Sequence, residues 1–280
     1  MKIYVDSRNR ISGSNEDFSF QLPETVDIPE SLAYLDVVLV PNVFWTVRTG
    51  YNDKLYLYER KPDPILSYQI NEAYRAITLP SGQYNGYTLA QAVEAAMNAG
   101  RTLPAAYVVV FNATTGRFDF SNNLAAAEQF TLYPTAYLLT QLDAWNAATG
   151  AGLSKDNVHD AGRVLGLNGA QAISRASSNT IISGDSSVNM LTHHTLFVHS
   201  NLGALGDSYG PRGESDIIRR VVLDSPQNSI NVDRHTTAHD NVKVLRQSLR
   251  SMDFRLADAE GRTVDLQGQH WSFSVILHEQ

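Results

Sequence analysis

The feature that most constrains the fold is a strand pattern at the end of the chain, in the segment WSFSVILHEQ. Large apolar residues alternate there with polar or less bulky ones, and the apolar positions are Trp271, Phe273, Val275 and Leu277. A period of two residues is that of a β-strand with one buried face. Chain ends usually fray, so a final strand this apolar is expected to pair with strands from distant parts of the sequence. Deleting residues 271–280 is therefore expected to prevent folding.

Further strand patterns lie on both sides of the middle of the chain. Phe18, Phe20 and Leu22 alternate with polar residues, whereas the runs 33–40 and 54–59 are apolar on both faces, as central strands are. Later runs at 194–200, 215–223 and 251–266 continue the pattern, and the last of these predicts a hairpin that turns at 258–261. No crossover helices separate these runs, which favours an antiparallel sandwich over a parallel α/β sheet.

The middle of the chain has a different pattern. A helix is predicted near 88–99, with Thr88 as its N-cap and Gly100 as its end. A hairpin is predicted at 107–121 around a glycine-containing loop. The Ala- and Gly-rich run 143–161 predicts an irregular or helical excursion.

These patterns predict a mainly β protein in which a small α+β domain interrupts one sandwich. We expect residues 1–69 to form the first part of the sandwich, 70–185 the inserted domain and 186–280 the second part. Neither part alone has the seven or eight strands that a stable sandwich takes.

Composition narrows the classes of function. The chain has 280 residues, a formal net charge of -7 and no cysteine. The negative charge disfavours nucleic-acid binding, and the missing cysteines exclude a disulfide framework, a thiolate metal site and a cysteine nucleophile. No run of 18 apolar residues predicts a membrane span, and the polar start of the chain does not resemble a signal peptide.

Three motifs suggest chemistry, and each has a simpler interpretation. Ser208 in GDSYG resembles a hydrolase nucleophile but lacks a strand-to-helix elbow. His235 and His239 in HTTAH have helical metal-ligand spacing but lack the glutamate of the protease motif, and the adjacent His193 and His194 would point to opposite faces of a strand. We therefore predict no catalytic, cofactor-binding or metal-binding residues, no cofactor and no enzymatic activity.

Arginines recur at 7–10 and 217–220, and Arg246 and Arg250 follow. They could form a local basic face, although charges on strands more often make a solvated face. No phosphate-binding or dinucleotide-binding glycine pattern accompanies them. No specific nucleic-acid binding is predicted.

Four blocks of sequence occur in an order that resembles a known family. They are IYVDSRNRISGSNEDFSFQLPETVDIP near the start, LPSGQYNGYTLAQAVEAAMN followed by VVFNATTGRFDFSN in the middle, GPRGESDIIRRV at 210–221, and LRSMDFRLADAEGRTVDLQGQHWSFSVIL at the end. Together they resemble the minor capsid, or penton, protein of Polinton (Maverick) elements, adintoviruses, virophages and related double-stranded DNA viruses. The resemblance spans nearly the whole chain, and the Ala- and Gly-rich run 143–161 is a departure from it.

The resemblance implies a single jelly roll that forms a homopentamer at the five-fold vertices of an icosahedral capsid. The implied partners are other copies of the chain and a double-jelly-roll major capsid protein. The implied location is the virion, after synthesis in the host cytoplasm or nucleus. The inserted domain would project outward or brace a neighbouring subunit.

Two other classes of function stay open at this point. A carbohydrate-binding or adhesin-like sandwich would need an exposed aromatic platform, for which Trp45 and Trp145 are the candidates. A serine hydrolase that uses Ser208 is the enzymatic alternative. The mass in solution separates these classes, because neither alternative predicts a pentamer.

Overall fold

The computed structural model describes residues 1–280 except 64–68, 123–127, 176–180, 204–207, 235–240 and 280. Its contacts divide the chain into two units. The first unit joins Met1–Phe44 to His193–Gln280, and the second is Trp45–Thr192. We call them the jelly-roll unit and the middle unit.

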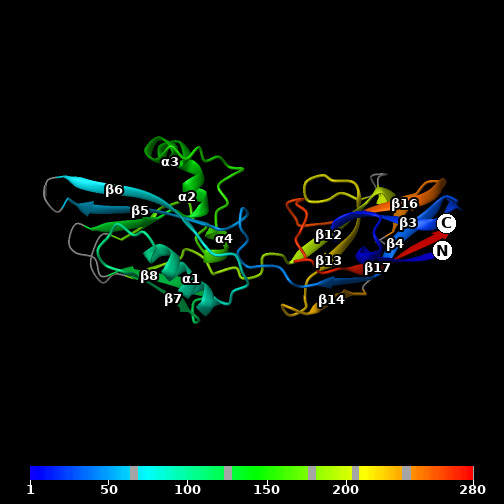
Figure 1. The fold of residues 1–280 in the computed structure, drawn as a ribbon, viewed down its shortest axis with the longest axis horizontal. Helices are drawn as coiled ribbons and strands as arrows, with labels where there is room; N and C mark the ends of the chain where they lie inside the picture. The colour runs from blue at the N-terminus through cyan, green and yellow to red at the C-terminus, as the bar shows by residue number, and fades with distance from the viewer. Residues whose placement is uncertain (64–68, 123–127, 176–180, 204–207, 235–240, 280) are drawn as a thin grey trace. The chain divides into compact units, whose positions relative to one another are not determined.

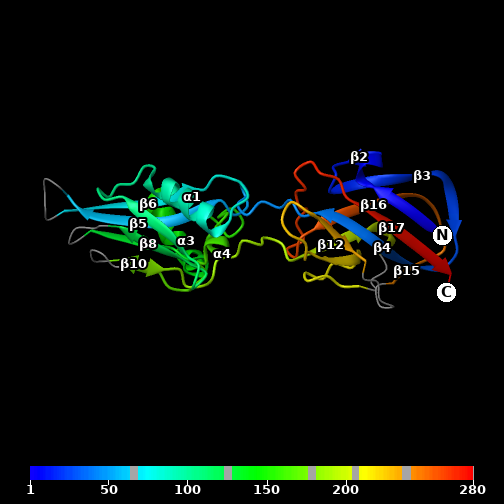
Figure 2. The same ribbon diagram turned by 90° about the horizontal axis from the view of Figure 1, so that it is seen from below.

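The jelly-roll unit is a sandwich of two antiparallel sheets (Figures 1 and 2). One sheet has the order β1-β17-β4-β14, with β15 also paired to β4, and the other has the order β13-β12-β16-β3-β2. The strands are β1 (Lys2–Asp6), β2 (Ser12–Gly13), β3 (Asp17–Ile28), β4 (Ser31–Pro41), β12 (Thr195–Ser200), β13 (Ile217–Val222), β14 (Ile230–Asp233), β15 (Val242–Val244), β16 (Gln247–Ala257) and β17 (Ser272–Glu279), with short 3₁₀ turns at Ser7–Asn9 and Asn201–Gly203.

The pairing in this unit is nested. β1 pairs with β17, β3 with β16, β4 with β14 and β15, and β12 with β13. If β14 and β15 are counted as one position and β2 is set aside, the first strand pairs with the eighth, the second with the seventh, the third with the sixth and the fourth with the fifth. Eight strands in two sheets with this connection form a jelly roll.

The predicted position of the terminal strand is confirmed. β17 lies between β1 and β4, with Val5 opposite Phe273 and Leu35 opposite Val275. Its inward-facing residues are buried together with Phe18 and Phe254 from the other sheet. The ring of Trp271 meets that of Phe18 edge to face at 5.9 Å between centroids. Residues from both ends of the chain therefore form one core.

The predicted hairpin at 251–266 is formed only in part. β16 is regular, but the returning segment makes a single bridge, between Ala257 and Thr263. Val264 and Leu266 are nevertheless buried in the core of the unit. The main-chain N–H of Val264 still binds the oxygen of Leu256 at 3.1 Å, whereas the N–H of Leu266 binds Glu16 Oε1 at 3.0 Å.

The described part of the middle unit contains two antiparallel sheets and four helices (Figure 1). The sheets have the orders β10-β9-β5-β6 and β11-β8-β7. Its elements are β5 (Lys54–Pro62), β6 (Ile70–Thr78), α1 (Gly86–Asn98), β7 (Tyr107–Asn112), β8 (Arg117–Asn122), β9 (Gln129–Leu132), α2 (Thr135–Thr140), α3 (Leu142–Thr149), α4 (Gly162–Leu165), β10 (Ile173–Arg175) and β11 (Ile182–Ser183).

The boundaries of the middle unit differ from those predicted at residues 70 and 185. The apolar run 54–59 was assigned to the sandwich, but it belongs to β5, which pairs with β6 along its whole length and with β9 on its other side. β5 is a central strand, as predicted, but of a different sheet. Local pairing with the following strand decides the sheet, and an apolar run alone does not reveal its partner.

The N-cap of helix α1 lies three residues before the predicted one, Thr88. It is Asn85, whose side chain accepts hydrogen bonds from the N–H groups of Tyr87 and Thr88. The Thr88 hydroxyl in turn accepts a hydrogen bond from the N–H of Asn85. Thr88 is thus the third residue of a capping box. Gly100, with φ of 70°, follows the C-terminal cap, as expected for a helix end.

Helix α1 also covers the free edge of β7. The Asn98 side chain binds both the N–H and the C=O of Tyr107 at 2.9 Å, and Glu94 Oε2 accepts from the N–H of Val109 at 2.9 Å. An uncovered strand edge would present unpaired N–H and C=O groups to other chains. These contacts protect the edge and attach the helix to the sheet.

Candidate functional site

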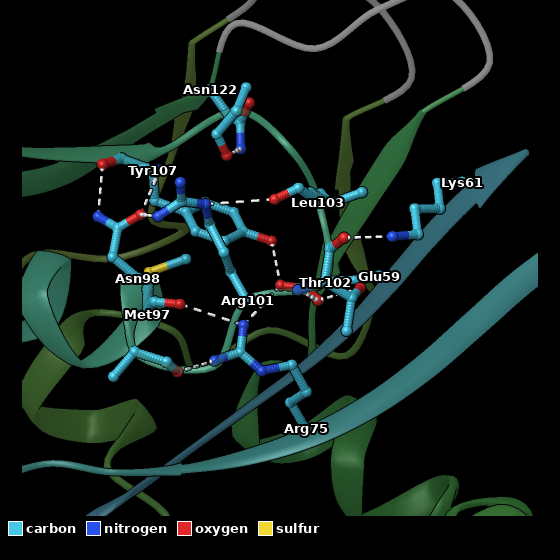
Figure 3. Close-up of polar contacts among 12 residues, drawn as sticks. Glu59, Lys61, Arg75, Met97, Asn98, Arg101, Thr102, Leu103, Tyr107 and Asn122 are labelled. Carbon is cyan, nitrogen blue, oxygen red and sulfur yellow. Dashed lines mark hydrogen bonds and ion pairs between the residues drawn. The ribbon is translucent and has the colours of Figure 1, made fainter. Parts of the chain in front are cut away.

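A buried carboxylate, Glu59 on β5, lies at the centre of a polar network in the middle unit (Figure 3). Arg75 Nη1 on β6 donates to Glu59 Oε1 at 2.6 Å, and the Tyr107 hydroxyl on β7 donates to the same oxygen at 2.7 Å. The main-chain N–H and the hydroxyl of Thr102 donate to Oε2 at 2.8 and 2.5 Å. Four donors therefore hold the charge that burial would otherwise make very costly.

Arg75 connects this network to the end of helix α1. Its guanidinium donates to the carbonyl oxygens of Met97 at 3.1 Å and Ala99 at 2.5 Å (Figure 3). The last carbonyls of a helix have no partners within the helix, and a cation at that end is favourable. One arginine thus joins β5, β6 and α1.

The Glu59 network resembles a catalytic constellation only in composition. Burial, followed by the charge of Glu59 and the hydrogen bond to it, raises the pKa of Tyr107 well above its usual range. A phenol with a raised pKa keeps its proton and serves as a donor, and both oxygens of Glu59 are occupied by protein donors. The arrangement therefore fixes the packing of three elements and leaves no acid or base ready for a substrate.

Asp160 is a partly buried acid of the middle unit with a shifted pKa. Burial raises its pKa to about 6, against the opposing effect of hydrogen bonds from the Thr135 hydroxyl and the Gly162 N–H. A carboxyl group that titrates near neutrality is a candidate general base. Here its contacts are to the start of α2 and the start of α4, which assigns it a packing role.

The structure places the remaining candidate residues in separate surroundings. The Ser208 hydroxyl donates to the main-chain oxygen of Ile217, and among the described residues it has no hydrogen bond to a histidine. His193 packs edge to face on Phe44 at 4.8 Å between ring centroids, and the strand begins only at Thr195. His235 and His239 lie outside the described residues. Within the described ranges no three His, Asp or Glu side chains are grouped for a metal ion.

The predicted arginine-rich strand does not form a basic face. Arg219 on β13 is buried and forms a two-pronged ion pair with Asp233 on β14, with Nη2–Oδ1 at 2.9 Å and Nε–Oδ2 at 3.2 Å. β13 and β14 belong to opposite sheets. The pair therefore joins the two sheets of the jelly roll, while the neighbouring Arg220 is exposed.

The suggestion that Trp145 forms an exposed aromatic platform is wrong. Trp145 on α3 is 1% exposed and makes edge-to-face contacts with Tyr56, Tyr74 and Tyr133 at 5.1 to 5.3 Å between centroids. It packs the helical excursion onto β5 and β6. Trp45 is 39% exposed, so of the two candidates only this tryptophan reaches solvent.

The outer faces of the two jelly-roll sheets both mix polar and apolar residues. The outward positions on the β1-β17-β4-β14 sheet are Lys2, Tyr4, Asp6, Leu32, Tyr34, Asp36, Leu39, Pro41, Ile230, Val232, Lys243, Ser272, Ser274, Ile276 and His278. Those on the other sheet include Asp17, Ser19, Gln21, Phe197, Arg220, Val222, Ser251, Asp253 and Arg255. A solvated sheet face is normally polar, and the clearest exception is β14, where Ile230 is 59% and Val232 is 40% exposed.

No family model and no curated protein matches this chain. Solved structures do match it. The mavirus penton protein, in a selenomethionine-labelled crystal structure, is 10% identical, with 99% of each chain covered and a TM-score of 0.48. A chain of the 3.5 Å cryo-EM structure of the Sputnik virophage is 11% identical, with 99% of this chain and 97% of that chain covered and a TM-score of 0.42.

Sequence reasoning missed the two buried charge networks. Glu59 ends the apolar run LYLY, and Arg219 directly follows two isoleucines. A charged residue inside an apolar strand is a signal that the charge is buried and paired. The partners of Glu59 and Arg219 could not be named from the sequence, because Arg75 and Asp233 are brought close only by strand pairing and sheet packing.

No helix among the described residues is long and apolar enough to cross a bilayer.

Proposed function

We propose that this chain is a structural protein of an icosahedral capsid, placed as a homopentamer at the five-fold vertices. The observation that carries the proposal is the complete nested pairing of a jelly roll, closed by the two ends of the chain, with a whole folded unit between its third and fourth strands. The penton-like sequence blocks fall on elements of both units, including β1 to β3, α1, the β7–β8 hairpin, β13, and β16 to β17.

A capsid role also agrees with the surroundings of the polar groups. Glu59, Asp160 and Arg219 are held by protein donors or acceptors and stabilise packing. A protein that works by shape and contact area needs rigid units more than reactive groups. The proposed partners are neighbouring copies of the chain and a double-jelly-roll major capsid protein, and the proposed location is the virion.

A ring closed by five-fold rotation uses heterologous contacts, in which two different surfaces of one subunit meet. The acidic net charge disfavours a role in holding the genome, so no nucleic-acid binding is assigned.

The test is the mass of the purified chain, measured by light scattering over a range of concentrations, alone and after co-expression with a double-jelly-roll shell protein. A species of five times 30.9 kDa, alone or released from shells, is the expected result. A chain that stays monomeric alone and does not enter shells when co-expressed contradicts the proposal.

A further inference from the structure

The chain contains two Asn-Gly dipeptides, Asn85–Gly86 and Asn168–Gly169. The main-chain nitrogen that follows an asparagine can attack the side-chain amide carbon, and glycine allows the closest approach because it has no Cβ atom. Asparagine is a thermolabile residue type for this reason. The two dipeptides share this chemistry, so the contacts that the fold gives to each decide whether it reacts.

Asn85, the N-cap of α1, has the contacts of a reactive amide. Its Oδ1 accepts from the main-chain N–H groups of Tyr87 at 3.0 Å and Thr88 at 2.9 Å. Donors on a carbonyl oxygen stabilise the negative charge that develops there during nucleophilic attack. To the described residues, neither Asn85 Nδ2 nor the Gly86 N–H makes a hydrogen bond, and Asn85 is exposed. The leaving and attacking nitrogens are therefore both unrestrained.

The fold requires both residues of this dipeptide. Asn85 provides the cap of α1, and Gly86 is buried beside the Phe111 ring. A Cβ atom at position 86 would lie 2.6 Å from atoms of that ring. Replacing either residue would therefore disturb the start of α1, which explains why a reactive pair is tolerated there.

Asn168–Gly169 has the opposite contacts. Asn168 Nδ2 donates to Ser186 Oγ at 2.7 Å, and the Gly169 N–H donates to Asp185 Oδ2 at 2.5 Å. The Asn168 N–H donates to the other oxygen of Asp185 at 2.8 Å. The leaving nitrogen and the attacking nitrogen are thus both held, and two hydrogen bonds must break before this dipeptide can react.

We infer that Asn85 is a site of spontaneous deamidation and that Asn168 is protected from the same reaction. The Gly86 nitrogen loses its proton to water and bonds to Asn85 Cγ. The bond between Cγ and Nδ2 breaks, and this nitrogen takes up a proton and leaves as ammonia. Water then opens the resulting succinimide ring at either carbonyl carbon. The product is aspartate or isoaspartate, and the reaction consumes water and releases ammonia without any redox change.

The two products differ in their effect on α1. Aspartate adds a negative charge at the start of the helix, where the helix dipole favours it, and it remains a good N-cap. Isoaspartate adds a carbon atom to the main chain and displaces the side-chain oxygen from the N–H groups of Tyr87 and Thr88. Only the second product is expected to destabilise the capping box.

The test incubates the folded full-length chain in heavy-oxygen water at mildly alkaline pH and maps its peptides by mass spectrometry. Incorporated heavy oxygen marks deamidation that occurred before digestion. We expect Asn85 to convert at least about 10-fold faster than Asn168, because two hydrogen bonds protect Asn168. In the chain unfolded by denaturant the two sites should convert at similar rates, which attributes the difference to the fold.

Two variants sharpen the test. Asn85→Ser keeps an N-cap oxygen but has no amide, so the acidic species that anion-exchange chromatography resolves in the aged wild-type chain should be absent. Asp185→Ala combined with Ser186→Ala should speed conversion of Asn168 by about 10-fold in a chain whose circular dichroism is unchanged. Equal rates at the two sites of the folded wild-type chain overturn the inference. It is also overturned if Asn85 stays unmodified in the folded chain while the unfolded chain converts both sites.

Discussion

The jelly-roll unit closes through strands from opposite ends of the chain, whereas the middle unit is built from one continuous stretch, Trp45–Thr192. In the first unit β1, β4 and β17 lie side by side, and the core cannot form before the last residues are in place. In the second, β5 pairs with the next strand, β6, and a buried carboxylate network ties these strands to α1. Different substitutions and deletions should therefore destabilise the two units.

The largest expected effect is on the jelly-roll unit alone. Deleting residues 271–280 removes β17 from between β1 and β4 and exposes the inner faces of both sheets. We expect this unit to lose its cooperative unfolding transition, while the middle unit keeps its own, because none of its strands pairs with β17. Limited proteolysis followed by mass spectrometry measures this. Protection of both units in the truncated chain would contradict the comparison.

The next effect is on the middle unit. Glu59→Ala leaves Arg75 without its carboxylate partner and is expected to lower the free energy of unfolding by about 4 kcal/mol. Glu59→Gln keeps the size and one acceptor oxygen and should cost about half as much. Denaturant unfolding, followed by the fluorescence of the buried Trp145, measures both variants. Equal stability of the alanine variant and the wild-type chain would show that the network is not structural.

The corresponding pair in the jelly-roll unit offers a sharper comparison. Asp233→Leu leaves Arg219 buried without a partner and should cost about 3 kcal/mol, whereas Arg219→Met combined with Asp233→Leu should lie within about 1 kcal/mol of the wild-type chain. The measurement is a double-mutant cycle in denaturant. If the double variant is as unstable as Asp233→Leu alone, the ion pair stabilises the fold by more than the free-energy cost of burying its two charges.

The pH dependence of stability should distinguish the middle unit. Burial raises the pKa of the Asp160 carboxyl to about 6 in the folded protein, from about 3.8 in the unfolded chain. The folded protein therefore takes up a proton at this group more readily than the unfolded chain does. This group therefore stabilises the fold most below about pH 4, and that contribution is lost as the pH rises through 6. Asp160→Asn should gain stability relative to the wild-type chain over that range, by about 2 to 3 kcal/mol at pH 7. Parallel curves for the two proteins would contradict the assignment.

The smallest effect concerns Ser208. Ser208→Ala removes one hydrogen bond to the oxygen of Ile217 and should cost about 1 kcal/mol. The rate of ester hydrolysis by the purified protein should not change. Loss of a measurable esterase activity with an unchanged fold would instead favour the hydrolase alternative.

Much of the fold could be predicted where the signal is local. The terminal strand, the strand around Phe18 and the strand at 107–112 follow from alternation, and the end of α1 follows from Gly100. The assignment of 54–59 to the sandwich failed, because a run that is apolar on both faces indicates a central strand without indicating its sheet. The burial of Trp145 could not be predicted, because its aromatic partners come from β5, β6 and the residue after β9.

The sequence by itself determined which faces of the strands are apolar, where the helix α1 ends and that the last strand must be paired, because these depend on periodicity and on side-chain chemistry at fixed spacing. The tertiary structure alone decided which strands are neighbours, that Glu59 meets Arg75 and Tyr107, and that Arg219 meets Asp233 across two sheets. It also showed that Ile230 and Val232 point outward, while Asn231 and Asp233 are buried. Such pairings depend on residues that are distant in the chain, and their free energies are set by burial and geometry that exist only after folding.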